Sequence, residues 1–142
     1  MLSGRLFAEM RVLLSYSMSG PAVDTLLWHI GNKYGVALGR RTKKMSKTPG
    51  EAVELLAKAA QRSGWGKITV DNKFETAGEM VVFFEDCVFC EGVVGEKTPA
   101  CSFLSGIPAG IGEEIYGGSV VAREELCRGV GDSLCRFRIT KV

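Results

Sequence analysis

The sequence predicts an α+β fold in which a helical N-terminal half packs on a mostly antiparallel four-stranded sheet. Up to Gly64, apolar residues recur every three or four positions, which is the spacing of amphipathic helices. From Gly66 onward, short runs rich in Val, Ile, Phe and Thr alternate with glycine-containing turns, as strands do. The resulting order of three helices, two strands, one helix and two strands is typical of helices that cover one antiparallel sheet.

The chain has 142 residues, of which 46% are hydrophobic, and we expect a single domain over residues 1–142. No internal repeat and no low-complexity linker divides the sequence. A chain of this length buries about two thirds of the surface that its unfolded form exposes, so it needs no disulfide scaffold to fold.

Three helices are expected in the N-terminal half. The first is Gly4–Ser15, and Ser19–Pro21 opens a second helix of about 20 residues. The basic run Arg40–Lys47 is interpreted as a solvated loop, because no aromatic residue is interleaved with it to stack on bases. Thr48–Glu51 forms a capping box with proline at the first helical position, which starts a third helix that ends near Gly64.

Four strands are expected, at Lys67–Val70, Glu79–Cys87, Ser119–Cys127 and Leu134–Lys141. The first two form a hairpin around the turn Asp71–Gly78, and the last two form a hairpin around a glycine-containing turn. Between the hairpins, Thr98 and Pro99 start a fourth helix. Pro108 is expected to kink or break it, because proline lacks the amide hydrogen that a helix interior needs.

Three glycines recur four residues apart on the second helix, at Gly31, Gly35 and Gly39. A glycine in a helix interior costs about 1 kcal/mol relative to alanine, so the row indicates that another element packs closely there. That element is another helix of the same chain, a partner subunit or a ligand. Because isologous pairing is the commonest oligomer geometry, we predict a homodimer through the helical half.

The formal net charge of +2 gives no field that would draw the protein onto nucleic acid or an anionic membrane. The longest apolar runs, such as Met80–Phe84, are far shorter than the roughly 18 residues of a membrane span. Arg5, Glu9 and Arg11 interrupt the N-terminal apolar residues before a signal-peptide core forms, which predicts a cytoplasmic protein. In that reducing compartment, grouped cysteines favour a metal site over disulfides.

All five cysteines lie in the C-terminal half, and three of them predict a zinc site. Cys127 and Cys135 flank one tight turn, so pairing of their strands brings the two sulfurs together. Cys101 lies in the first turn of the fourth helix, where the helix dipole favours a thiolate. Glu124 offers a carboxylate as fourth ligand and Glu125 is the alternative, which gives a closed structural site. Because residues 124 and 127 face opposite sides of an unbroken strand, this set requires a bulge or an early strand end.

Cys87 and Cys90 form a Cys-x-x-Cys pair without thioredoxin-like surroundings. We interpret them as ordinary buried cysteines, with a redox dithiol or an additional metal contact as the alternatives. His29, the only histidine, has no neighbouring nucleophile and is interpreted as a packed or surface residue. Because no nucleotide-binding glycine loop is found either, the sequence gives catalysis no support, although it leaves the question open.

Five residues share a spacing that is characteristic of one family: Cys101, Glu124, Cys127, Cys135 and Phe137. The pattern resembles the 4-vinyl-reductase-type domain, a hydrocarbon-binding family, over about residues 5–142. The resemblance implies a fold similar to subunits of the Golgi transport particle (TRAPP). It further implies zinc on the corresponding Cys, Glu, Cys and Cys side chains, and a small hydrocarbon-like ligand.

The resemblance and the apolar helical half favour a zinc-stabilised binding module for a small hydrophobic molecule, with the role of a sensor or carrier. Candidate pocket residues are aromatic or apolar: Trp28, Tyr34, Phe83, Phe103 and Leu104. Two alternatives remain open. One is a reductase of tetrapyrrole vinyl groups, which would need a borrowed electron donor. The other is a structural protein that forms dimers.

Overall fold

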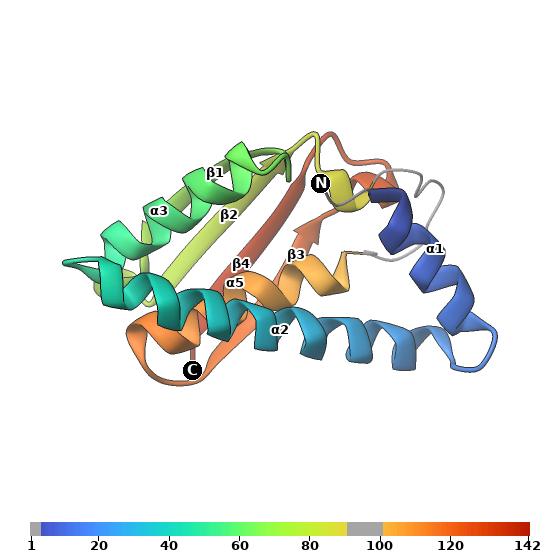
Figure 1. The fold of residues 1–142 in the computed structure, drawn as a ribbon, viewed down its shortest axis with the longest axis horizontal. Helices are drawn as coiled ribbons and strands as arrows, with labels where there is room; N and C mark the ends of the chain where they lie inside the picture. The colour runs from blue at the N-terminus through green and yellow to red at the C-terminus, as the bar shows by residue number, and fades with distance from the viewer. Residues whose placement is uncertain (1–3, 91–100) are drawn as a thin grey trace.

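The computed structural model describes residues 4–90 and 101–142 (Figure 1). The helices are α1 (Gly4–Ser15), α2 (Gly20–Met45), α3 (Pro49–Arg62), α4 (Phe74–Ala77) and α5 (Ser102–Tyr116), with 3-10 turns η1 (Val88–Cys90) and η2 (Arg128–Val130). The strands are β1 (Lys67–Lys73), β2 (Glu79–Glu85), β3 (Val120–Leu126) and β4 (Cys135–Lys141). This order confirms the predicted α+β class.

The four strands form one sheet in the order β1-β2-β4-β3, and every neighbouring pair is antiparallel. Helices α3 and α5 cover one face of the sheet, and α2 lies along α5 in a further layer (Figure 1). Side chains alternate across the sheet, so Met80, Val82 and Phe84 of β2 face the helices and are buried in the core. None of the described helices combines the length and the apolar character that crossing a membrane requires.

Side-chain caps start α2 and α3 where the sequence predicts them. Ser19 Oγ accepts a hydrogen bond from the amide of Ala22 at 3.3 Å. Thr48 Oγ1 accepts one from the amide of Glu51 at 3.1 Å, and the Glu51 carboxylate accepts one from the amide of Lys47 at 3.1 Å. Each bond satisfies an amide that has no partner within its helix, which fixes where the helix begins.

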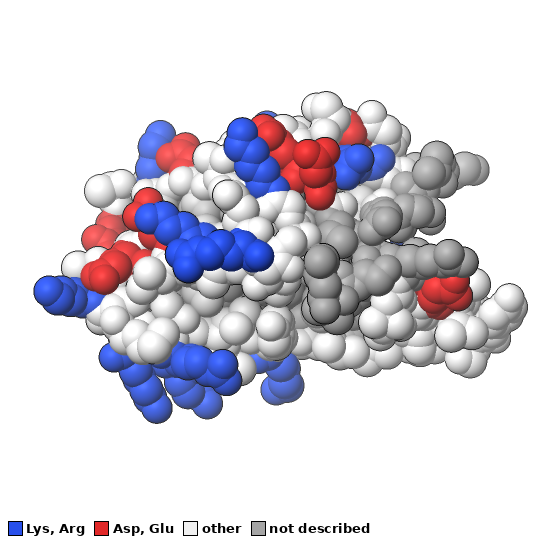
Figure 2. Space-filling model, turned by 45° about the horizontal axis from the view of Figure 1, so that its top comes forward, with Lys and Arg blue, Asp and Glu red and all other residues white. Residues whose placement is uncertain are grey.

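Helix α2 is longer than expected, because it continues through the basic run to Met45. The prediction of a loop there was wrong: Arg and Lys are good helix formers, and cations at a helix C-terminus complement its dipole. Arg40 Nε lies 3.2 Å from Glu114 Oε1, and Lys43 Nζ donates to the carbonyl of Glu114 at 3.3 Å, which ties this end of α2 to α5. Figure 2 shows basic side chains gathered along this edge of the molecule.

The glycine row of α2 packs against α5 of the same chain. A Cβ atom at Gly31 would lie 2.0 Å from the carbonyl oxygen of Phe103, and one at Gly35 would lie 2.1 Å from that of Ile107. Gly106 and Gly110 of α5 approach the backbone of α2 about as closely. Glycines on both helices therefore bring the two backbones together, and the row is not available to a partner subunit.

Helix α5 runs without a break through Pro108, contrary to the expected kink or break. Gly106 and Gly110 hold the helix against α2 on either side of the proline, so packing compensates for one missing backbone hydrogen bond. The predicted start of this helix at Thr98 and Pro99 lies outside the described residues, and the described helix begins at Ser102.

Candidate functional site

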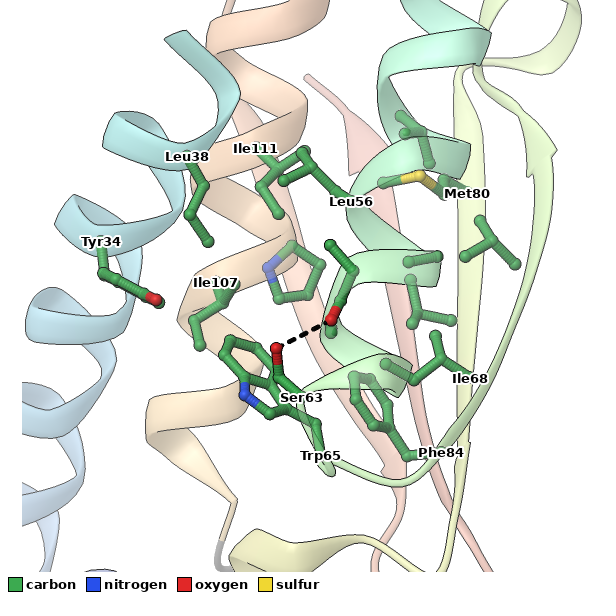
Figure 3. Close-up of a pocket in the computed structure, with 17 residues that line it drawn as sticks. Tyr34, Leu38, Leu56, Ser63, Trp65, Ile68, Met80, Phe84, Ile107 and Ile111 are labelled. Atoms are coloured by element: carbon green, nitrogen blue, oxygen red, sulfur yellow. Dashed lines mark hydrogen bonds between the residues drawn. The ribbon is translucent and has the colours of Figure 1, made fainter. Parts of the chain in front are cut away.

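An apolar cavity of about 150 Å³ lies between α2, α3, α5 and the sheet (Figure 3). Its walls include Tyr34 and Leu38 of α2, Val53, Leu56, Ala57 and Ala60 of α3, Ile107, Pro108 and Ile111 of α5, and Ile68, Val70, Met80, Val82 and Phe84 of the sheet. None of the described lining residues carries a charge. The cavity exists because the face that α3 turns toward the sheet carries alanines where larger side chains would fill the gap.

Three residues supply the polar side-chain atoms of the lining: Ser63, Trp65 and Tyr34. The Ser63 hydroxyl donates a hydrogen bond to the carbonyl of Ala59 at 2.9 Å, the dashed line in Figure 3. The Trp65 ring lies 6.3 Å from that of Tyr34 and makes an edge contact with Phe89 at 5.4 Å. The polar atoms of the cavity therefore gather near its aromatic wall, and the rest of the lining is hydrocarbon.

Of the five pocket residues expected from the sequence, Tyr34 lines this cavity. Trp28 borders a separate, polar surface pocket beside Glu124. Phe83 lies on the opposite face of the sheet from its neighbours Val82 and Phe84, because successive side chains of a strand alternate.

Two more of the five lie outside the lining. Phe103 packs on Phe89, with ring centroids 5.7 Å apart, and Leu104 is fully buried in the core. Sequence reasoning missed Trp65 and the alanines of α3. The alanine-rich stretch of that helix was the signal that could have revealed an unfilled space.

The cysteines converge at the other end of the core. Cys101 stands directly before α5, Cys127 directly after β3, and Cys135 begins β4; all three are at most 3% exposed. The sulfur of Cys101 lies 3.8 Å from that of Cys127 and 4.0 Å from that of Cys135. Two sulfurs bound at about 2.3 Å to one tetrahedral zinc ion lie about 3.8 Å apart, so these three residues fit thiolate ligands of zinc.

A β-bulge decides between the two candidate carboxylates. The register of β3 on β4 shifts between Glu124 and Leu126, which gives the bulge that the sequence argument required. The Glu124 carboxylate accepts a hydrogen bond from the amide of Cys101 at 3.3 Å and lies within 4.8 Å of the sulfurs of Cys101 and Cys127. Glu125 instead accepts hydrogen bonds from two arginines on the outer face of the sheet, at 3.0 Å each.

Cys87 and Cys90 join this cluster, so they are not ordinary cysteines packed among hydrocarbon. The sulfur of Cys90 lies 2.6 Å from that of Cys101 and 3.2 Å from that of Cys135. The sulfurs of Cys87, Cys90, Cys101 and Cys135 all lie within 4.8 Å of one another, and all four residues are buried. The structure thus favours the alternative of an additional metal contact for the Cys-x-x-Cys pair.

Protons are held tightly where the cluster carries no compensating positive charge. Burial, together with the nearby Cys127 and Cys135, raises the pKa of Glu124 from 4.5 to about 9. Hydrogen bonding with Cys127 and Cys135 raises the pKa of the Cys101 thiol. Hydrogen bonding with Cys101 lowers the pKa of Cys135, because its thiolate accepts bonds from neighbouring thiols. A divalent cation would displace these protons, as metal binding to thiols requires.

The fold and the two sites together define a class of protein: an α+β domain with an apolar cavity at one end of its core and a buried cysteine cluster at the other. Residues 80–141 match the 4-vinyl reductase domain, so the segment from β2 to β4 belongs to the 4-vinyl reductase family. This match agrees with the resemblance seen in the sequence. No curated protein matches the sequence.

Solved structures confirm the fold. The phenol-responsive sensory domain of the transcription activator PoxR, determined with phenol, has a TM-score of 0.81 and 21% identity, and the match covers 99% of this chain and 75% of that one. A trafficking protein particle complex subunit 3 from Naegleria fowleri, covalently bound to palmitic acid, gives 0.72 and 17%, covering 98% and 92%. A vinyl-4-reductase family protein from Methanocaldococcus jannaschii gives 0.70 and 20%, covering 100% and 83%.

Proposed function

We propose that this protein is a binding module for a small, neutral, apolar molecule, which occupies the cavity between α2, α3, α5 and the sheet. The observation that carries the proposal is a volume of about 150 Å³ without a charged side chain in its lining. An apolar cavity of this size stays dry and accepts a ligand as large as benzene. A ligand with one polar substituent would place that substituent near Trp65 and Tyr34, whose polar atoms lie at the aromatic wall.

Two of the similar structures support this class of ligand, because one was determined with phenol and the other holds palmitic acid. The volume of the present cavity favours a single ring over a long acyl chain. It is also too small for a tetrapyrrole, so no described feature favours the reductase alternative. The role of a sensor or carrier follows from binding without chemistry.

Tryptophan fluorescence tests the proposal, because Trp65 lines the cavity and Trp28, the other tryptophan, does not. In a Trp28→Phe background, titration with benzene, toluene and phenol is expected to change the Trp65 emission with saturation. Calorimetry of the same titrations measures the affinity directly.

Filling the cavity supplies the matched control. Ala60→Leu places a larger side chain in the lining, whereas Ala77→Leu makes the same change on the exposed surface of α4. We expect Ala60→Leu to abolish binding of all three molecules and Ala77→Leu to leave it intact. Unchanged binding in a folded Ala60→Leu variant would show that the cavity is not the binding site.

We further propose that zinc stabilises the domain, with Cys101, Glu124, Cys127 and Cys135 as ligands. The fit rests on the sulfur spacing and on the bulge that turns Glu124 toward Cys101. Bound zinc would supply folding free energy there, because a closed ligand shell leaves no position for water or substrate. The start of α5 would be tied to the hairpin of β3 and β4. Elemental analysis of Cys127→Ser, which should lose zinc, tests this assignment.

The homodimer remains a proposal, and it needs a surface other than the glycine row. Leu26, Ile30 and Tyr34 recur four residues apart on α2 and are 37%, 47% and 43% exposed. On α1, Leu13 and Tyr16 are exposed as well. An apolar stripe of this kind is typical of a helix that pairs with a partner, and a second copy of the chain would bury it.

A further inference from the structure

Six donor side chains converge on one buried region, which is more than one tetrahedral ion can use. They are Cys87, Cys90, Cys101, Glu124, Cys127 and Cys135. One ion with four ligands would leave two of these donors buried and uncoordinated. The Cys87 and Cys90 pair is the surplus relative to the ligand set proposed above, and its sulfurs lie as deep in the cluster as the others.

We propose that the cluster is a two-ion centre, in which the sulfurs of Cys101 and Cys135 bridge two divalent ions. This inference rests on the metal site proposed above and adds a second ion to it. Two tetrahedral ions have eight ligand positions. Four terminal donors and two bridging sulfurs, each counted twice, fill all eight. Cys87 and Cys90 are terminal ligands of one ion, and Glu124 and Cys127 are terminal ligands of the other.

The arrangement of the chain matches this division into two terminal pairs. Cys87 and Cys90 flank the tight turn η1, closed by a hydrogen bond of 3.2 Å from the Cys90 amide to the Cys87 carbonyl. A Cys-x-x-Cys turn is the usual way in which a chain presents two thiolates to one ion. Asp86, with φ of +52°, turns the chain away from β2 just before this pair.

The second terminal pair, Glu124 and Cys127, comes from the bulged end of β3. The two proposed bridges, Cys101 and Cys135, belong to different elements and lie 4.0 Å apart. Cys101 shares a group of mutually close donors with Cys87, Cys90 and Cys135, and another with Glu124 and Cys127. The amide of Arg128 also donates to the sulfur of Cys135 at 3.5 Å, which stabilises negative charge there.

Charge favours a second ion. Five thiolates and one carboxylate carry a charge of −6, which one divalent ion reduces to −4 and two reduce to −2. The last value equals that of one zinc ion with four thiolates, the common structural site. Because the five cysteines are at most 5% exposed, uncompensated charge in this region would be costly. With the second ion, none of the six donors needs to keep a proton.

Metal stoichiometry tests the proposal on the full chain, purified without chelator under reducing conditions with zinc present. Native mass spectrometry should find two zinc ions per chain, and one in the double variant Cys87→Ser/Cys90→Ser. Ala109→Ser is the matched control, because it buries a hydroxyl on α5 without removing a donor, and it should retain two. Titration with cobalt(II) should show a break at two equivalents. The electron paramagnetic resonance signal per cobalt should fall as the second ion binds, because bridging thiolates couple the two spins.

The alternative outcomes separate this inference from the metal site on which it rests. One zinc ion per chain that survives in Cys87→Ser/Cys90→Ser would overturn the second ion and leave the first assignment standing. One zinc ion that is lost in that variant but retained in Glu124→Gln and Cys127→Ser would overturn both and assign the metal to four thiolates. Absence of metal from the folded wild-type chain would overturn the metal site altogether.

Discussion

The close backbone contact of α5 with α2 at Gly106 gives a prediction that can be worked out quantitatively. A Cβ atom added at Gly106 would lie 2.2 Å from the carbonyl oxygen of Trp28 and 2.7 Å from the amide nitrogen of Asn32 on α2. Both atoms belong to the backbone and cannot rotate away, so Gly106→Ala must push the two helices apart by roughly 1 Å. Overpacking of this kind costs up to about 3 kcal/mol, while alanine returns about 1 kcal/mol of helix propensity. The expected net loss is therefore about 2 kcal/mol.

Gly112→Ala on the same helix is the matched control. Its Cβ would lie 3.6 Å from Ile139 Cγ2 and 3.9 Å from Val120 Cγ1, which are ordinary van der Waals contacts. Helix propensity then dominates, and this variant should gain up to about 1 kcal/mol. For a domain of this size, about 1 kcal/mol shifts the melting temperature by about 3 °C, so calorimetry should place the two variants roughly 9 °C apart. A Gly106→Ala variant as stable as wild type would refute the close packing of α2 on α5.

Three further predictions concern the metal site and the subunit interface. Glu124→Gln should lower the zinc content, whereas Glu125→Gln should leave it unchanged, since Glu125 pairs with arginines on the outer face; elemental analysis would contradict the ligand assignment if the effects were reversed. In chelator, the folded chain binds the Glu124 proton more tightly than the unfolded chain, so this group contributes stability at low pH that is lost between about pH 4.5 and 9. The melting temperature of metal-free Glu124→Gln should lack that part of the slope, and an identical slope would argue against the raised pKa. Finally, sedimentation should find a dimer that Ile30→Asp dissociates, and a wild-type monomer at micromolar concentration would exclude the dimer.

Local signals were sufficient to predict most of the fold. Ser19 and Thr48 cap helices where their side chains can reach amides of the first turn, and these bonds depend on a few neighbouring residues only. The errors arose where distant parts of the chain decide the structure. Contacts with Glu114 help to hold the basic end of α2 against α5, and packing of Gly106 and Gly110 keeps α5 continuous through Pro108. Neither partner is visible in the local sequence.

The two sites differ in how far the sequence could predict them. Spacing brought Cys101, Cys127 and Cys135 together correctly, because each stands at the end of an element and the hairpin fixes where those ends meet. The approach of Cys90 to the same cluster depends on how η1 leaves the sheet, which the Cys-x-x-Cys spacing alone does not determine. A cavity is harder still, since it is the volume that side chains fail to fill, and Tyr34 was the one lining residue expected.

The two sites are joined by one short segment. Cys90, at the end of η1, lies in the cysteine cluster, and its neighbour Phe89 makes an edge contact with Trp65 of the cavity wall. Phe89 also packs against Phe103, which follows Cys101 by two residues at the start of α5. A metal that binds Cys90 and Cys101 would therefore fix both ends of the aromatic contact that supports Trp65. Because a ligand in the cavity contacts the same tryptophan, whatever free energy the metal adds to ligand binding, the ligand must add equally to metal binding.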